Sequence, residues 1–332
     1  MRRTLVCSVL ALGLSLTACQ SPSDSEDPGA TGLPTGVGPL ATDAVLWAEG
    51  DTIHVENRTI RARKPVRAMV EANGRIYLVQ GRSDVVRVTD GGVPRPTSLR
   101  AEELRASEDG RYLGFLDTSD GFPWSTAIVD LESGEIVVHD GAGMGDADDD
   151  LADLYEDAQP QVLGFAGDDL FVRTTAGVMS WDPKTMKRTE HGDLYFFARR
   201  DVGGGQLLSA LVRRGRLVVP KDPYDSTQRG HVSPDGSVVL MPVDGRTQVF
   251  EVDGGRRLPA DLQGRTFILG GWTDEDTAYG ISFDGSAFGP RRVRLVQCRL
   301  AVEQRSCRVL RTIRPSPHKL VLFPTGSGAT DY

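Results

Sequence analysis

Two stretches of the chain carry one pattern and decide the fold. Residues 106–115 read Ala-Ser-Glu-Asp-Gly-Arg-Tyr-Leu-Gly-Phe, and residues 232–241 read Val-Ser-Pro-Asp-Gly-Ser-Val-Val-Leu-Met. Each copy places an Asp-Gly turn before an apolar run, which predicts a β-hairpin. Ser107 and Ser233 lie 126 residues apart, or three periods of 42. A period of this length is typical of the blades of a β-propeller, which span roughly 40 to 50 residues.

Weaker copies of two elements fill the intervals between these stretches. The hairpin pattern returns at residues 71–79, 167–172, 203–208 and 273–279. An apolar strand followed by an acidic residue and a turn occurs at residues 128–135, 179–185 and 249–255. Together these patterns resemble the SPDGxxLxF and DxxTG signatures of the WD40-like and TolB-type propellers. The resemblance covers most of residues 42–323 and implies a fold, without implying an activity.

We therefore expect an all-β chain that forms a single β-propeller of about seven four-stranded blades. Six blades are expected to begin near Pro65, Leu104, Pro160, Tyr195, Gly230 and Thr266. Three short strands within residues 45–62 make an incomplete set, and residues 319–323 supply one strand at the far end. These N- and C-terminal strands are predicted to share one blade and so close the ring. Two packed β-sandwiches are the alternative, and the regular spacing argues against them.

Composition supports an all-β fold, and charge restricts the classes of partner that the chain can bind. Glycine and proline number 38 and 19, and no stretch of about 15 residues keeps helical apolar spacing without one of them. The formal net charge is −8, which argues against nucleic acid as a partner. Basic residues are mostly arginine, a bias typical of GC-rich bacterial genomes such as those of actinobacteria.

The N-terminus resembles the signal peptide of a bacterial lipoprotein. Met1-Arg2-Arg3 is basic, Leu5–Leu16 is apolar, and Leu16-Thr17-Ala18-Cys19 matches the lipobox, whose cysteine is acylated and becomes the mature N-terminus. An ordinary secretory signal or a buried apolar segment is the alternative. The apolar run is too short to span a bilayer, whereas two acyl chains on Cys19 would anchor the protein stably.

The signal peptide and the repeats together predict how the chain is divided. Residues 1–18 form the signal peptide, residues 19–41 a flexible tether, residues 42–325 the propeller and residues 326–332 a disordered tail. The tether is rich in Ser, Pro, Gly and acidic residues, so we expect no fold in it. We expect a monomer on the extracytoplasmic face of the cell membrane.

Cys298 and Cys307 remain as a pair once the other two cysteines are assigned to the signal peptide and the lipid. A tight turn centred on Val302-Glu303 would place them opposite each other on neighbouring strands. An extracytoplasmic location is oxidising, so we predict a structural disulfide. A redox or metal pair is the alternative, and the wide spacing argues against it.

A search for catalytic or cofactor motifs finds none with the required spacing. The histidines occur singly, at positions 54, 139, 191, 231 and 318, without the spacing of a zinc site. Residues 285–289 place serine one position early for a nucleophile elbow, and residues 141–145 lack the lysine of a phosphate-binding loop. We therefore expect no enzyme activity and no cofactor.

The acidic run at residues 145–157 is the one insertion that departs from the blade rhythm. Asp146, Asp148 and Asp150 alternate as calcium ligands can. Leu151 stands where an EF-hand requires glycine, so a solvated loop or short helical turn is the favoured interpretation and calcium the weaker one.

Three aromatic residues are candidates for a binding surface. Phe122, Trp124 and Trp272 lie in or beside predicted connections, where propellers display ligand-binding loops, whereas Trp47 and Trp181 lie on predicted strands and are assigned to the core. Loop aromatics could stack on a sugar or a peptide. The expected function is a membrane-anchored, non-catalytic scaffold that binds a cell-envelope protein or glycan. The alternative is a propeller enzyme, lactonase-like or lyase-like, with a site in the central channel.

Overall fold

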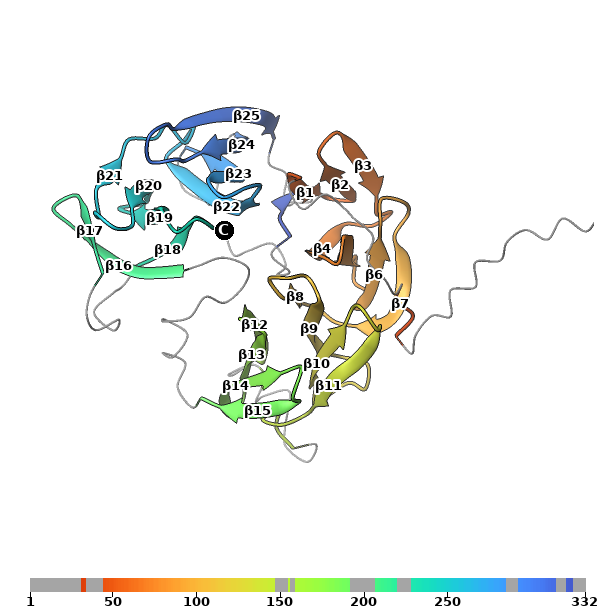
Figure 1. The fold of residues 1–332 in the computed structure, drawn as a ribbon. Coiled ribbons are helices and arrows are strands. Elements are labelled where there is room, and N and C mark those ends of the chain that lie inside the picture. The colour runs from red at the N-terminus through yellow and green to blue at the C-terminus, as the bar shows by residue number, and fades with distance from the viewer. Residues whose placement is uncertain are drawn as a thin grey trace, which may run out of the picture.

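The computed structural model describes residues 31–33, 44–146, 155, 159–191, 207–219, 228–284, 292–314 and 321–324. The elements that it describes are 26 β-strands in six antiparallel sheets, arranged around a common centre (Figure 1). In the sheets β4–β7, β8–β11 and β22–β25 the first strand lies nearest the centre and the last strand lies at the outer rim. The chain is an all-β propeller, as the repeats predicted.

One sheet combines both ends of the chain. Its strands, in spatial order, are β26 (Val321–Leu322), β1 (Leu46–Glu49), β2 (Thr52–Val55) and β3 (Arg58–Arg61). Strand β26 pairs with β1 through Ala48 opposite Leu322 and Glu49 opposite Val321. The prediction that N- and C-terminal strands share a blade is confirmed.

Three sheets of four consecutive strands follow in the chain. The first contains β4 (Val66–Ala72), β5 (Arg75–Gln80), β6 (Val85–Thr89) and β7 (Arg95–Arg100). The second contains β8 (Leu104–Ala106), β9 (Tyr112–Asp117), β10 (Ser125–Asp130) and β11 (Glu135–Asp140). The third contains β12 (Gln161–Ala166), β13 (Asp169–Thr174), β14 (Gly177–Asp182) and β15 (Lys187–Glu190). Each begins within one residue of its predicted start.

The C-terminal half of the chain forms the remaining two sheets. One has six strands, β17 (Arg216–Val218), β16 (Leu207–Arg213), β18 (Gln228–Val232), β19 (Val238–Val243), β20 (Arg246–Glu251) and β21 (Arg257–Leu258). The other contains β22 (Thr266–Trp272), β23 (Thr277–Phe283), β24 (Val293–Arg299) and β25 (Ser306–Ile313). Strands β16 and β17 stand where the blade near Tyr195 was expected, and the start of that blade lies outside the described residues. In the structure they extend the sheet β18–β21.

Successive sheets pack face to face through apolar layers. Along β9, Leu113 and Phe115 join the core shared with sheet β4–β7, whereas Tyr112 and Leu116 join the core shared with sheet β12–β15. A strand buried on both faces needs a neighbour on each side, which explains why a single sheet would be unstable. The approach is close at Gly114, where a Cβ atom would lie 2.6 Å from Leu170 Cδ1.

The sheet that joins the chain ends packs against sheet β22–β25 in the same way. Trp47, Tyr279 and Phe323 are all buried in this layer. The Trp47 ring stacks on His54 with centroids 3.9 Å apart, and the Arg311 guanidinium lies 5.3 Å from the Trp47 centroid. Trp47 and Trp181 are both core residues, as predicted from their strand positions.

Residues 31–33 correct the expectation that the whole tether lacks a fold. The Thr31 Oγ1 donates to the Gly134 carbonyl at 2.6 Å, and the Thr31 carbonyl accepts from the Ser98 N–H at 3.1 Å. Leu33 is only 1% exposed and joins the core between sheets β4–β7 and β8–β11. The physical reason is that Leu33 supplies a large apolar side chain, and β7 offers an edge with unpaired main-chain groups.

Cys298 and Cys307 lie directly opposite each other on β24 and β25 and form a disulfide. Pairing of the two strands ends at Arg299 and Ser306, so the connection at residues 300–305 is wider than the tight turn expected there. Its centre is nevertheless Val302-Glu303. The register of the two strands therefore brings the sulfur atoms together.

The predicted signal peptide, Cys19 and the predicted tail at residues 326–332 lie outside the described residues. Within the part of the chain that the structure describes, there is no helix with the length and apolarity needed to traverse a membrane.

Candidate functional site

The repeated Ser-x-Asp-Gly pattern forms the same turn in two sheets. Between β8 and β9, Ser107 Oγ accepts from the Tyr112 N–H at 2.8 Å and donates to Asp109 Oδ1 at 2.6 Å. The Arg111 N–H also donates to Asp109 Oδ1, at 3.0 Å. Gly110 has a φ of +70°, which side chains rarely adopt, so glycine is required there. The sequence pattern is therefore a hydrogen-bonding pattern.

The second copy, between β18 and β19, repeats each contact. Ser233 Oγ accepts from the Val238 N–H at 3.1 Å and donates to Asp235 Oδ1, which also accepts from the Ser237 N–H at 3.0 Å. Gly236 has a φ of +73°. Asp235 is thus held at a fixed place at the edge of its sheet.

The next sheet carries a related turn, between β22 and β23, with three acidic residues in a row. The Thr273 N–H donates to the Thr277 carbonyl at 2.8 Å, which closes the turn. Asp274 Oδ1 accepts from the Asp276 N–H at 3.0 Å, and Asp276 Oδ1 accepts from Thr277 Oγ1 at 3.0 Å. Asp276 also pairs with Arg299 at 3.2 Å. Local hydrogen bonds therefore fix two of the three carboxylates.

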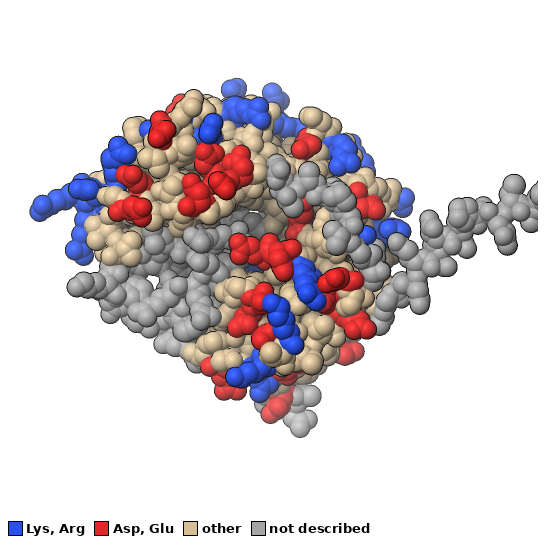
Figure 2. Space-filling model, viewed as in Figure 1, with Lys and Arg blue, Asp and Glu red and all other residues tan. Residues whose placement is uncertain are grey.

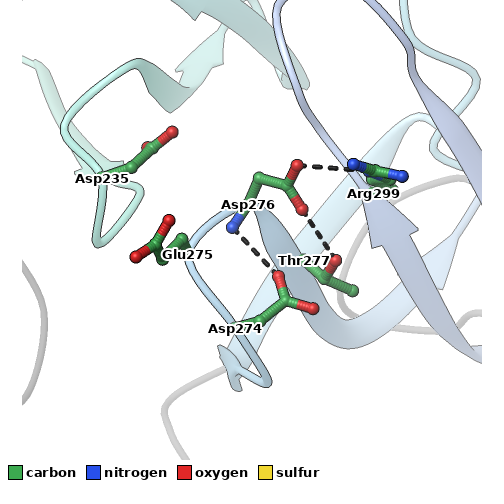
Figure 3. A pocket seen from close by; sticks show the side chains of 6 residues that line it. All are labelled: Asp235, Asp274, Glu275, Asp276, Thr277 and Arg299. Carbon is green, nitrogen blue, oxygen red and sulfur yellow. Dashed lines mark hydrogen bonds and ion pairs between the residues drawn. The ribbon is translucent and has the colours of Figure 1, made fainter.

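These two turns meet and enclose an open groove of about 480 Å³ between neighbouring sheets (Figure 3). The Asp235 N–H donates to the Glu275 carbonyl at 3.4 Å, which links one turn to the other. Asp235 stands on one turn, Asp274, Glu275 and Asp276 stand on the other, and Arg299 lies beside Asp276. The lining consists of Asp235, Asp274, Glu275, Asp276, Thr277 and Arg299. We call this set the acidic groove.

Two of its carboxylates are held in the ionised form. Burial alone would raise the pKa of Asp235, but hydrogen bonds from Ser233 and Ser237 outweigh it, so that the pKa is lowered. In the same way, hydrogen bonds from Thr277 and the Asp276 N–H outweigh burial and lower the pKa of Asp274. Four carboxylates face one guanidinium, a formal charge of −3. Acidic side chains are also frequent around the centre of the molecule in Figure 2, and basic ones toward the rim over β25, β3 and β17.

The groove differs from a metal centre. Among the described residues, no three or more His, Cys, Asp or Glu side chains are grouped so that they could hold a metal ion. Of the three aspartates considered for calcium, Asp146 is described and exposed, whereas Asp148 and Asp150 lie outside the described residues. The calcium interpretation therefore stays a prediction.

Two of the three candidate aromatics come together, with a partner that the sequence analysis did not single out. Phe122 stacks on Trp124 with ring centroids 5.3 Å apart, and Tyr155 meets both rings edge-on at 5.1 and 5.0 Å. Phe122 is 56% exposed. Tyr155 belongs to the acidic insertion, and a tyrosine in an otherwise acidic run is the signal that could have identified it.

Trp272 lies apart from this cluster and serves the core. It is the last residue of β22, is half-buried, and packs against the apolar layer that contains Leu258 and Phe267. Its indole N–H is buried and has no hydrogen-bond partner among the residues that the structure describes. The structure thus separates Trp272 from the two loop aromatics with which it was grouped.

The acidic groove itself was missed by the sequence analysis. Residues 273–279 were recognised only as a weak copy of the hairpin pattern. They carry three consecutive acidic residues, at positions 274–276, where the Asp-Gly turn of the pattern carries a single aspartate. Arg299 and Asp235 lie 64 residues apart in the chain, so no local motif links them.

Comparisons with known proteins give structural likeness only. No protein-family model matches the chain, and no curated protein matches its sequence. Among solved structures, a TolB-type protein from Agrobacterium tumefaciens is 12% identical, with 86% of this chain and 91% of that chain covered and a TM-score of 0.40. TolB from Acinetobacter baumannii is 13% identical, with coverage of 84% and 64% and a TM-score of 0.40. The dihydro-heme d1 dehydrogenase NirN is 14% identical, with coverage of 86% and 67% and a TM-score of 0.42.

Likeness at this level carries no argument about activity, ligand or partner. The fold assignment rests on the strand order and pairing of the chain itself.

Proposed function

We propose that this chain is a lipid-anchored scaffold on the extracytoplasmic face of a cell membrane, and that its acidic groove binds a basic segment of a cell-envelope protein without turnover. The anchor is proposed from the basic start, the short apolar run and the cysteine at position 19. Two acyl chains on one cysteine provide stable attachment. The propeller then acts as a rigid platform at the membrane surface.

The observation that supports binding is the state of the groove carboxylates. Asp235 and Asp274 are locked by turn hydrogen bonds that favour the charged form, so little rearrangement is needed when a cation approaches. Only Asp276 has a basic partner among the lining residues, through Arg299. The remaining negative charge is complementary to lysine or arginine side chains.

A binding role also agrees with the openness of the groove. Its walls are turns at the edges of two sheets, so an extended peptide can lie along it without entering the core. Rigid sheets that position exposed turns are the usual arrangement for recognition in propellers.

A charge reversal tests the groove. Glu275 is exposed. Within the described part of the chain, the hydrogen bonds that hold this turn are made by its other residues, Thr273, Asp274, Asp276 and Thr277. Glu275→Lys should therefore leave the fold intact. We expect the affinity for a fluorescent peptide of alternating lysine and serine to fall about tenfold at low salt, measured by anisotropy. The matched control is Glu135→Lys on β11, an equal change of charge at an exposed position. Equal affinities for both variants would refute binding at the groove.

The anchor is tested separately. Replacing Cys19 by alanine should move the protein from the membrane fraction to the soluble extracytoplasmic fraction. Retention of the variant in the membrane fraction would refute the lipid anchor and leave the test of the groove unaffected.

A further inference from the structure

The rings of Phe122 and Trp124 form a shelf on the connection between β9 and β10. They are nearly parallel, with an interplanar angle of 24°. Phe122 is 56% exposed although it is a large apolar side chain, and Trp124 is half-buried beneath it. An exposed ring backed by a second, nearly parallel ring presents a flat apolar surface on which the face of a ligand can stack.

The shelf is rigid because Tyr155 holds it from below. Tyr155 is 7% exposed, and its hydroxyl donates to the Met144 carbonyl at 2.9 Å and accepts from the Trp124 N–H at 3.3 Å. One side chain thus ties the loop of Trp124 to the connection that follows β11. A preorganised surface loses little conformational entropy when a ligand binds.

Polar groups lie at the same end of the sheet as the shelf. Asp117 is the last residue of β9 and pairs in register with Ser125, the first residue of β10, so it flanks the loop that carries both rings. His139 Nε2 lies 3.1 Å from Asp117 Oδ2, and its side chain is 44% exposed. A carboxylate accepts hydrogen bonds from hydroxyl groups, and an imidazole can both donate to them and accept from them.

The surrounding charge restricts the class of ligand. Asp117 and Asp140 are the last residues of β9 and β11 at this end of the sheet, and Asp120 and Asp146 lie on the connections that follow them. Arg188 is paired with Asp140. A polyanion or an anionic bilayer would be repelled by these carboxylates. A neutral sugar matches both features, since its C–H face stacks on an aromatic ring and its hydroxyl groups bond to the polar edge.

We propose that this aromatic shelf is a binding site for a neutral oligosaccharide. The proposal adds a second ligand to the scaffold function proposed above, and it stands on residues that the acidic groove does not use. The chain reverses direction at every strand, so the connection β9–β10 lies at the end of its sheet opposite to the turn β8–β9. The turns of the acidic groove are equivalent to β8–β9, which places groove and shelf on opposite faces of the propeller.

The test uses the full-length protein and four neutral hexasaccharides built from N-acetylglucosamine, glucose in α- or β-1,4 linkage, or mannose. Isothermal titration calorimetry is expected to show binding of at least one of them. Phe122→Ala should weaken that binding about tenfold or more, and Asp117→Asn should weaken it severalfold. Val93→Ala is the matched control, because Val93 is equally exposed, at 56%, and lies on the connection β6–β7 of another sheet. Its affinity should equal that of the wild type.

Two outcomes would overturn the proposal. In the first, none of the four sugars binds the wild type, or a sugar binds the Phe122→Ala variant as well as the wild type. In the second, the lysine-serine peptide binds the wild type, Phe122→Ala weakens binding of that peptide, and none of the sugars competes with the peptide. This result would assign the shelf to a basic peptide. Glu275→Lys should leave sugar binding unchanged, so failure at the groove and failure at the shelf are distinguishable. Phe122 is exposed, and an unchanged melting temperature will show that its replacement leaves the fold intact.

Discussion

The Thr31 carbonyl accepts two hydrogen bonds from one residue, Ser98, from the N–H at 3.1 Å and from Oγ at 2.6 Å. Ser98 lies on β7, the outer strand of its sheet, so Thr31 satisfies main-chain and side-chain donors that would otherwise face solvent. Leu33 follows and is buried between two sheets. The chain is therefore clamped to the rim at Thr31, 12 residues after Cys19. A segment of that length reaches at most roughly 40 Å.

The clamp depends on Leu33. Leu33→Ala should reduce the unfolding free energy by about 1 to 3 kcal/mol, because the substitution removes a buried side chain from a segment that can partly detach. Limited proteolysis should also cut sooner near residue 33. Urea unfolding monitored by tryptophan fluorescence measures the first effect, with the exposed Val93→Ala as control. Identical unfolding curves for both variants would show that the clamp adds nothing to stability.

Phe323 is expected to be essential for joining the two ends of the chain. It is 4% exposed, meets Tyr279 edge-on at 5.9 Å, and follows the strand that pairs with β1. Phe323→Ala should lower the unfolding free energy by about 3 to 5 kcal/mol, since it leaves a cavity between sheet β22–β25 and the sheet of the chain ends. Calorimetry provides the measurement. A loss below about 0.5 kcal/mol would mean that the C-terminal strand is dispensable.

His54 should make stability depend on pH below neutrality. Burial, with repulsion from Arg311 and Arg61, lowers its pKa from 6.5 to about 4. The unfolded chain therefore binds a proton at higher pH than the folded chain, so the unfolding free energy declines as the pH falls from about 6.5 to about 4.

His54→Phe keeps a flat ring against Trp47 and removes the titration. The decline over this range should be smaller in the variant, by on the order of 1 kcal/mol once solvent screening of the half-exposed ring is considered. Urea unfolding between about pH 7 and pH 4.5 tests this, and parallel pH profiles would assign the dependence to other groups.

The two Ser-x-Asp-Gly turns should make similar contributions to stability, with Asp235 slightly the larger because it also accepts from Ser237 Oγ at 2.7 Å. Asp109→Ala and Asp235→Ala each remove a carboxylate that accepts from a serine hydroxyl and a main-chain N–H. A loss of about 1 to 2 kcal/mol is expected for each, and the two losses should add in the double variant because the turns share no contacts. Chemical denaturation of the three variants measures this. A much larger effect at one turn would contradict the equivalence of the two copies.

The disulfide should contribute through the short loop that it closes. Replacing Cys298 and Cys307 by alanine should lower the unfolding free energy by about 2 to 3 kcal/mol on a loop-entropy argument. The comparison of wild type and double variant by thermal melting tests this value. Melting curves that coincide would show that pairing of β24 with β25 holds this region without the cross-link.

The sequence predicts local structure best where one short pattern specifies one turn. Ser107 to Gly110 and Ser233 to Gly236 encode their hydrogen bonds within a few residues, so the hairpins and the blade period follow from them. The pairing of Cys298 with Cys307 could be predicted for the same reason, since a hairpin of known centre has a known register. The sheet shared by the chain ends followed from counting strands.

Contacts between distant residues could not be predicted in this way. Nothing near Thr31 in the sequence indicates Ser98, and composition alone makes residues 19–41 resemble a free tether. Tyr155 reaches Phe122 because two connections leave the same end of one sheet. Asp235 meets Glu275 because two sheets lie side by side in the ring.

Turn chemistry and strand spacing act over a few residues, and they are sufficient to predict most of the sheets, their order and the joining of the two ends. They did not predict that β16 and β17 join the sheet β18–β21. The acidic groove, the aromatic shelf and the clamp at Thr31 each need groups from separate turns, connections or sheets. Their geometry is created when the apolar faces of the sheets pack, because burial of apolar surface drives the sheets together. Polar groups at the sheet edges then contact groups of the neighbouring sheet.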